Sequence, residues 1–208
     1  MASPSLPIEV SADGSGFRWV AEGGDPVAEA FHAVRRMTYA STGSRDPVDL
    51  VRTGRGACTA KHLLLCQLLH GMDVPARVLT VSGSFGADLP AASGMPEALK
   101  AMIGEGGVPD FHNVVEAEVG SETVMLDATW HDAMAAVGFP VNSDWQGRGS
   151  TRLAVRGAVV DGGAANPVDG KAALIAAMPA QERERRRRFL DLITQYSLAQ
   201  THTSEGRV

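Results

Sequence analysis

Apolar residues recur every three or four positions in several parts of the chain, which is the spacing that buries one face of a helix. The helices that this pattern predicts span Val27 to about Tyr39, Cys58 to about His70, Glu97–Ile103, Lys171–Met178 and about 180–199. Gly71 is expected to end the second helix, because glycine is common just after a helix C-terminus. The segment Thr42–Gly56 is expected to be a loop with one helical turn at 49–51.

Other stretches alternate apolar and polar residues and therefore predict strands. They lie at Phe17–Val20, Ala76–Ser82 and Arg152–Val160, and a hairpin is expected over Phe111–Thr129. The long segment 83–110 comes directly before the hairpin, and loops of that length often act as lids. Together these elements predict an α+β fold, with a helix packed on an antiparallel sheet. The 208 residues are interpreted as a single domain, 1–208, with its core at about 27–160.

The register of the hairpin determines which of its side chains can meet. A two-residue turn at 120–121 pairs Val119 with Glu122. His112 and Asp127 then lie diagonally on one face, and a turn one residue earlier makes them direct neighbours. Both arrangements separate their Cβ atoms by about 5–8 Å and allow a hydrogen bond, whereas a three-residue turn without a bulge would send them to opposite faces. The other face is apolar and should pack on the core; it holds Val115, Ala117, Val119, Val124 and Leu126.

Cys58 opens a predicted helix directly after the glycine-rich stretch 54–57. The first N–H groups of a helix lack partners, and the helix dipole is positive there. A thiol at this place is stabilised as the thiolate, the form that attacks carbonyls. Taken singly, a cysteine is more often a small buried hydrophobe, and a histidine or aspartate is more often structural. Cys58, His112 and Asp127 nevertheless follow the order of a nucleophile, a base and an orienting carboxylate.

Three motifs around these residues resemble the transglutaminase-like superfamily. The segment 56–78, with its turn Gly71-Met72-Asp73-Val74-Pro75-Ala76-Arg77, resembles the nucleophile helix and following strand of that family. His112–Glu116 resembles the histidine strand, and Leu126–Trp130 resembles the aspartate strand. The resemblance covers about Gly54–Trp130. It implies a transglutaminase-like, papain-like cysteine proteinase core with a Cys-His-Asp site that carries out acyl chemistry through a thioester.

The chain departs from the protein-crosslinking transglutaminases in two ways. Ala57 and Thr59 flank the cysteine where those enzymes have Gln and Trp, and the chain is too short for their β-sandwich domains. The resemblance therefore implies a small bacterial-type protease, amidase or amide-forming acyltransferase, without a cofactor. Its substrate would be a peptide, a small-molecule amide or a carrier-bound acyl group. Hydrolysis and transfer to an amine are both open.

This interpretation gives each residue of the set a role. Cys58 attacks the carbonyl, His112 takes the thiol proton and later gives it to the leaving amine, and Asp127 orients the imidazole. The backbone N–H of Cys58 is expected to make one oxyanion contact, and no side chain is indicated as the second donor. Trp130 is a candidate substrate-binding residue that could also shield the His–Asp pair, although a tryptophan at a strand end is equally often core.

Neighbouring residues allow alternatives. His62, one turn after Cys58, could be another base or half of a metal pair, and His131-Asp132 could add ligands, but the sequence offers no second pair at short spacing. Lys61 could help to hold the thiolate, but it is expected instead to extend along the surface. Cys66 lies about 12 Å further along the same helix, too far for a disulfide with Cys58. It is interpreted as an apolar filler.

Composition limits the possible partners. The net charge of −5 argues against general nucleic-acid binding, and no apolar stretch is long enough to cross a bilayer. Two cysteines, and no charged-then-apolar leader at 1–4, favour a cytoplasmic protein. The run Arg185–Arg188 is interpreted as the solvated face of the C-terminal helix.

Three classes of function are therefore considered. The favoured class is a cysteine-dependent amide hydrolase or acyltransferase. The second is a binding or scaffold module that keeps the fold without turnover, and the third is an anionic-ligand binder that uses the Arg185–Arg188 helix. The complete set of Cys58, His112 and Asp127 favours the first class, because a scaffold has no need of all three. The sequence does not indicate the oligomeric state.

Overall fold

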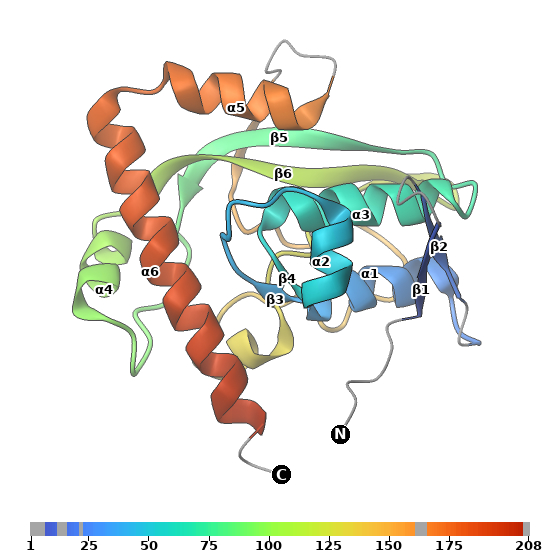
Figure 1. The fold of residues 1–208 in the computed structure, drawn as a ribbon, viewed down its shortest axis with the longest axis horizontal. Coiled ribbons are helices and arrows are strands. Elements are labelled where there is room, and N and C mark those ends of the chain that lie inside the picture. Colours follow the sequence, from blue (N-terminus) through green and yellow to red (C-terminus); the bar gives the residue numbers. More distant parts are fainter. Residues whose placement is uncertain (1–6, 12–15, 21–22, 161–165, 206–208) are drawn as a thin grey trace.

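A computed structural model describes residues 7–11, 16–20, 23–160 and 166–205 of the chain. Its centre is a four-stranded antiparallel sheet in the order β7-β6-β5-β8. The strands are β5 (Ala76–Phe85), β6 (Val108–Val119), β7 (Glu122–Leu126) and β8 (Gly157–Val160). Helices pack against this sheet (Figure 1), so the molecule has the α+β architecture that the sequence predicts.

The α-helices of the described residues lie around the sheet. They are α1 (Pro26–Arg36), α2 (Pro47–Thr53), α3 (Cys58–His70), α4 (Glu97–Gly104), α5 (Pro167–Ala177) and α6 (Ala180–Glu205). Both α3 and α5 contact β5 and β6, and α6 passes beside α4 (Figure 1). A 3₁₀ helix, η1, spans Asp132–Val137. Two small sheets complete the fold: β1 (Ile8–Val10) pairs with β2 (Phe17–Trp19), and β3 (Thr38–Tyr39) pairs with β4 (Arg55–Gly56). No helix among the described residues has the length and apolar character needed to cross a membrane.

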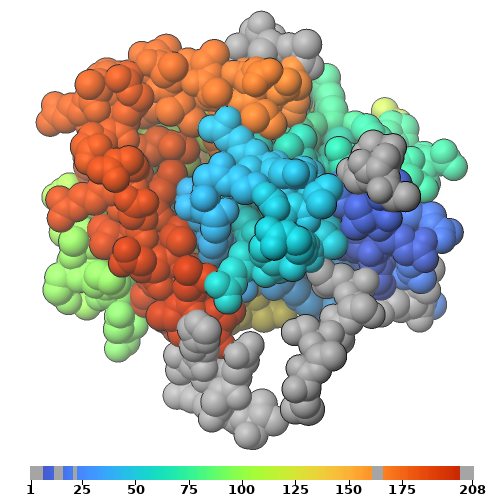
Figure 2. Space-filling view, in the orientation of Figure 1, coloured from blue at the N-terminus to red at the C-terminus, as the bar shows by residue number. Residues whose placement is uncertain are grey.

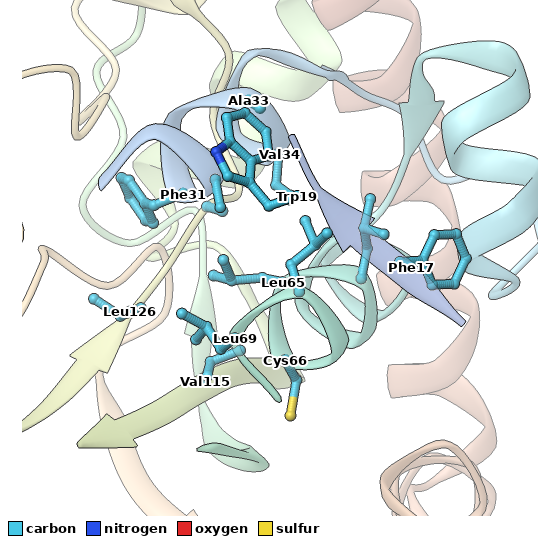
Figure 3. Close-up of a cluster of buried hydrophobic side chains, with 14 of the residues drawn as sticks. Phe17, Trp19, Phe31, Ala33, Val34, Leu65, Cys66, Leu69, Val115 and Leu126 are labelled. Atoms are coloured by element: carbon cyan, nitrogen blue, oxygen red, sulfur yellow. The ribbon is translucent and has the colours of Figure 1, made fainter. Parts of the chain in front are cut away.

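The central helix, α3, is buried on almost every side. Leu64, Leu65, Leu68 and Leu69 are fully buried in a core cluster shared with α1 and with the inner face of the β6–β7 hairpin (Figure 3). Cys66 belongs to the same cluster, and both cysteines are free thiols. Its interpretation as an apolar filler is therefore confirmed. Gly71 caps the helix at the predicted place.

The hairpin of β6 and β7 has the predicted two-residue turn. Val119 pairs with Glu122, and Gly120 in the turn has a φ of 63°, a conformation that favours glycine. The inner face packs on the core as expected, through Val115, Ala117, Val124 and Leu126. Because side chains alternate along a strand, this register turns His112 away from that face.

Two predictions for the N-terminal half of the chain are wrong. The first helix ends at Arg36, and Thr38–Tyr39 instead forms a strand with the residues just before Cys58. A complete helix, α2, replaces the single predicted turn. The side chain of Asp46 accepts a hydrogen bond from the N–H of Val48, and Pro47 occupies the first turn. An Asp-Pro pair of this kind is a helix-start signal.

The later elements also differ in length from their predictions. β5 continues three residues past Ser82, whereas the strand predicted over Arg152–Val160 is confined to its last four residues. The helix predicted over Lys171–Met178 begins four residues earlier, as α5 at Pro167, and ends at Ala177. α6 extends to Glu205, beyond the predicted end near residue 199. Its apolar face is buried as expected, through Phe189, Ile193 and Tyr196.

The approach of β8 to β5 depends on glycine. Gly157 pairs with Gly83, and a Cβ on Gly157 would lie 1.8 Å from the carbonyl oxygen of Ser82. We expect Gly157→Ala to lower the free energy of unfolding by about 1–3 kcal/mol, the usual cost of overpacking, in urea denaturation. Gly104→Ala is the matched control, because a Cβ there meets nothing within 4 Å. Equal stability of the two variants would contradict this account of the strand pairing.

Candidate active site

Cys58 is the first residue of α3, and the segment before it is held by the pairing of β4 with β3. A Cβ on Gly56 would lie 2.9 Å from a methyl carbon of Leu50, so glycine permits this close approach. The N-cap residue Ala57 makes no side-chain hydrogen bond to the helix. The side chains of α3 therefore leave the N–H groups of its first turn available to a ligand at Cys58.

His112 and Asp127 form a buried hydrogen bond. Nε2 of His112 lies 2.9 Å from Oδ2 of Asp127, and the two residues are 1% and 2% exposed. The carboxylate also accepts hydrogen bonds from the backbone N–H groups of Ala154, at 2.7 Å, and Thr129, at 2.9 Å. The predicted imidazole–carboxylate contact is confirmed. Because a carboxylate only accepts, Nε2 carries the proton, which leaves Nδ1 of the imidazole for Cys58.

The structure brings the thiol of Cys58 close enough to this pair to interact with the imidazole of His112. Burial by itself raises the pKa of the Cys58 thiol, but the positive charges of Lys171 and His112 outweigh it and hold that pKa well below its ordinary value. Burial opposes protonation of His112, yet Asp127 and Cys58 raise its pKa to about 10. The pKa of Asp127 lies well below its usual range, because His112 offsets the effect of burial. This arrangement favours a thiolate–imidazolium pair.

Lys171 is a site residue that the sequence did not reveal. Its Nζ lies 3.2 Å from Sγ of Cys58 and 3.3 Å from Oγ1 of Thr59, and the residue is 5% exposed. The hydroxyl of Thr59 in turn donates to Oδ1 of Asn113 at 2.8 Å. Lys171 is 113 positions from Cys58 in the chain, so no local pattern links the two. The contact depends on how α5 lies across the strands.

A pocket of about 120 Å³ opens beside Cys58. Its polar and charged lining includes Ser41, Ser44, Arg45, Asp110, Lys171 and Arg186. The segment 83–110, which was expected to act as a lid, contributes Asp110 alone to the residues that line the pocket. Helices α5 and α6 contribute more of the pocket wall. Figure 2 shows these two helices bordering the segment around residue 45.

Asp110 and Arg186 form a buried ion pair at the wall of this pocket. Nε of Arg186 lies 2.5 Å from Oδ1 of Asp110, and the side chains are 14% and 3% exposed. Asp110 precedes His112 by two positions on β6, so both side chains lie on one face of the strand. That alternation is a sequence signal from which Asp110 could have been found.

Trp130 is 3% exposed and packs in an aromatic cluster. Its ring stacks on Phe85 with a centroid distance of 5.7 Å and lies 4.9 Å from the ring of Tyr39. The ring of Phe85 is in turn 6.2 Å from the imidazole of His112. Trp130 is not among the residues that line the pocket at Cys58. Its predicted role in substrate binding stays a prediction.

His62 holds the backbone next to the aspartate from the side of α3. Its Nε2 accepts the N–H of Ala128 at 2.9 Å and lies 3.5 Å from Oδ1 of Asp127. Among the described residues, His62, His112 and Asp127 could offer a metal three ligand atoms within 4.8 Å of one another, whereas Cys58 is outside this group. Because Nε2 of each histidine already makes a hydrogen bond, the group is better suited to orienting His112 than to holding an ion.

The expectation that Lys61 extends along the surface is wrong. The residue is fully buried, because α3 is covered on this side by the end of α1 and by the segment after β7. Its Nζ donates to the carbonyl oxygens of Arg35, Met37 and Thr129 at 3.0, 2.8 and 2.9 Å. Lys61 thus ties the nucleophile helix to the segment that carries Asp127.

Comparisons with known proteins give one weak match. No protein-family model matches the chain, and no curated protein matches it. Among solved structures, a candidate cysteine protease from Cytophaga hutchinsonii is similar, with a TM-score of 0.37 and 21% sequence identity. The matched region covers 53% of this chain and 32% of that chain, so the chain spans about a third of the length of that protein.

The buried ammonium of Lys61 generates a stability prediction. Each buried carbonyl left without a donor costs about 1–3 kcal/mol, so Lys61→Met should lower the free energy of unfolding by about 3 kcal/mol or more. Lys100→Met is the matched control, because Lys100 pairs with the exposed Glu97. It should change stability by less than about 1 kcal/mol. Chemical denaturation of both variants checks this, and a small effect at Lys61 would show that its three contacts are dispensable.

Proposed function

We propose that this chain is a cysteine-dependent enzyme, a hydrolase or acyltransferase of transglutaminase-like type on a papain-like core. It would act on an amide or thioester through a Cys58 thioester intermediate. The observation that carries the proposal is the buried hydrogen bond between Nε2 of His112 and Asp127, which leaves Nδ1 for the thiol of Cys58. The thiol stands at the start of a helix, where unpaired N–H groups favour negative charge.

The mechanism follows from these positions. The sulfur of Cys58 attacks the carbonyl carbon, and the C=O electron pair moves onto oxygen. The tetrahedral intermediate then collapses, the bond to the leaving group breaks, and His112 gives its proton to a leaving amine. Water or an amine next attacks the thioester, with His112 as the base, and releases Cys58. Asp127 keeps Nδ1 directed at the reacting atoms through both halves of the cycle.

The pocket favours a small acyl group. A volume of about 120 Å³ between α3, α5 and α6 fits a short acyl chain better than a broad protein surface. Its lining is mixed, with apolar contacts from Ile175 and Leu190 beside the polar groups. A small-molecule amide, a peptide end or a carrier-bound acyl group would each satisfy this shape. Hydrolysis and amine transfer differ in what reaches the thioester, and we include both in the proposal.

The alternative function, binding of an anionic ligand by Arg185–Arg188 on α6, has less support than the enzymatic one. Arg185 pairs with Glu105, Arg186 with Asp110, and Arg187 with Glu184 and Asp191. Carboxylates of the described residues therefore balance these three guanidinium groups. The pairs of Arg185 and Arg186 reach outside α6 and support a structural role in docking this helix, whereas both pairs of Arg187 lie within it.

The first test is thioester formation. Purified protein incubated with a panel of small acyl amides and thioesters should give an acyl adduct on Cys58, detected by mass spectrometry. Cys58→Ala should abolish adduct and turnover, and His112→Ala should reduce turnover by about 10²–10⁴-fold, the usual contribution of a general base. Cys66→Ala is the matched control and should retain activity, since that thiol is a core filler. If no member of the panel acylates Cys58, the scaffold function replaces the enzymatic one.

The charges of the site also predict the pH profile. The lowered pKa of Cys58 means that its thiolate forms at a lower pH than an ordinary thiol does, so the rise of kcat/KM with pH should come below the titration range of a free cysteine. On the alkaline side, activity should fall as His112 loses its proton near its pKa of about 10. Asp127→Asn removes the charge that raises this pKa, so the alkaline limb should move to lower pH. Steady-state rates between pH 4 and 11 measure both limbs, and an unchanged alkaline limb in the variant would argue against His112 as the acid.

A further inference from the structure

The buried ammonium of Lys171 has no role in the mechanism described above. It reaches Cys58 from α5, on a different element from His112, and Nζ lies 3.2 Å from the sulfur. Gly170 and Lys171 are the two buried residues of α5. A helix that is otherwise half-buried or exposed thus directs its one lysine at the nucleophile.

We propose that Lys171 is a second cationic catalytic residue of this site: it holds the Cys58 thiolate in the resting enzyme and donates to the substrate's carbonyl oxygen when that thiolate attacks. This inference rests on the proposed function, because it requires a carbonyl substrate at Cys58.

The first argument is charge balance. An ammonium removed from water is costly unless an anion or several acceptors compensate it. In the part of the chain that the structure describes, the hydrogen-bond partners of Nζ are Sγ of Cys58 and the hydroxyl oxygen of Thr59, and neither is a carboxylate. Asp110, the acidic residue of the pocket wall, is already paired with Arg186. A thiolate at Cys58 is therefore the anion that balances Lys171.

The second argument is orientation. The hydroxyl of Thr59 donates its proton to Oδ1 of Asn113, so its oxygen is left to accept from Lys171. Asn113 is fixed in turn, because its amide donates to Oγ1 of Thr80 at 3.1 Å. This chain of hydrogen bonds holds Nζ beside the sulfur. Two of the three N–H groups of the ammonium are used, and one remains for a substrate atom.

The third argument is that the negative charge moves from the sulfur to the carbonyl oxygen during the reaction. When the S–C bond forms, the negative charge leaves the sulfur of Cys58 and the C=O electron pair becomes an oxyanion, two bonds from the sulfur. An ammonium already desolvated beside the sulfur, on a flexible side chain, can follow that charge without drawing in water. With the backbone N–H of Cys58, it supplies the second oxyanion donor. Lys171 keeps its proton throughout, since His112 provides the proton for the leaving amine.

Other charged groups around the thiol do not replace the contact between Nζ of Lys171 and Sγ of Cys58. Besides Lys171 and His112, the titratable or charged groups of the described residues that face Cys58 or line its pocket are Tyr39, Arg45, Lys61, Asp110, Asp127 and Arg186. Asp110 opposes the thiolate, Asp127 is committed to His112, and Lys61 is held by three carbonyl oxygens. Removal of Lys171 should therefore raise the pKa of Cys58 even with His112 in place.

The test compares alkylation of Cys58 by neutral iodoacetamide and by anionic iodoacetate, from pH 4 to 10, in the full chain. Lys171→Met should raise the apparent pKa of Cys58 by at least one unit and lower the iodoacetate-to-iodoacetamide rate ratio several-fold. Lys171→Arg should preserve both, because the positive charge remains. Lys100→Met, the same substitution on α4, is the matched control and should behave as the unmodified protein. With an acyl substrate, Lys171→Met should lower kcat by about 10²–10³-fold, the contribution of one oxyanion donor, and change KM little.

Thr59→Val provides a second variant that leaves Lys171 in place. It removes the acceptor that orients Nζ, and should raise the pKa of Cys58 by less than Lys171→Met does. Circular dichroism of each variant checks that it is folded. If Lys171→Met disturbs α5, the pKa of Cys58 in Thr59→Val and in Lys171→Arg still shows whether Lys171 stabilises the thiolate.

The outcomes separate the two proposals. If Cys58 forms the acyl adduct but its pKa and the kcat are unchanged in Lys171→Met, the role of Lys171 is overturned and the enzymatic function stands. If Lys171→Met reacts faster with both reagents at every pH, with the same pKa, then Lys171 only covers the thiol, and the inference is again overturned. If Cys58 titrates as an ordinary thiol in the unmodified protein and accepts no acyl group, the proposed function itself fails.

Discussion

The contact between the first turn of α3 and β6 is the constraint on which the site depends. Cys58 and Thr59 begin the helix, and His112 and Asn113 occupy neighbouring positions on the strand. The hydrogen bond from Thr59 to Asn113 joins the two elements beside the reacting pair, and the leucines further along α3 lock the helix against the sheet. A shift of this helix by a fraction of a turn would separate the thiol from the imidazole. The core that stabilises the fold therefore also sets the geometry of the candidate site.

Opposite charges alternate through the interior of the site. Asp127, His112, Cys58 and Lys171 form a continuous series, and the ion pair of Asp110 with Arg186 stands beside it. In a medium of low dielectric constant such charges interact strongly, and each is costly without its neighbour. The folded core supplies the energy that brings them together. Their arrangement holds the pKa of the Cys58 thiol well below that of a cysteine exposed to water.

Much of the central fold could be read from local patterns. The alternation of residues 111–129, with a glycine at the turn, predicts the hairpin and allows more than one turn placement, and the structure has the two-residue turn at 120–121. The start of α3 at Cys58 and its end at Gly71 follow from equally local signals. The pairing of Thr38–Tyr39 with Arg55–Gly56 was missed, because two-residue strands have no periodicity. The burial of Lys61 does not follow from the sequence for a related reason: its sequence neighbours do not show that both sides of α3 are covered.

The sequence by itself determined the α+β class and the hairpin that carries His112 and Asp127, because these depend on residues close together in the chain, and the structure selected the register that lets the two side chains meet. The approach of Cys58 to that pair was implied by motif order, and the packing of α3 on β6 provides it. Only the tertiary structure decided that Lys171 lies against the thiol, that Lys61 is buried and that α5 and α6 wall the pocket. These contacts join segments dozens of residues apart, and they depend on how whole elements pack, which no local periodicity encodes.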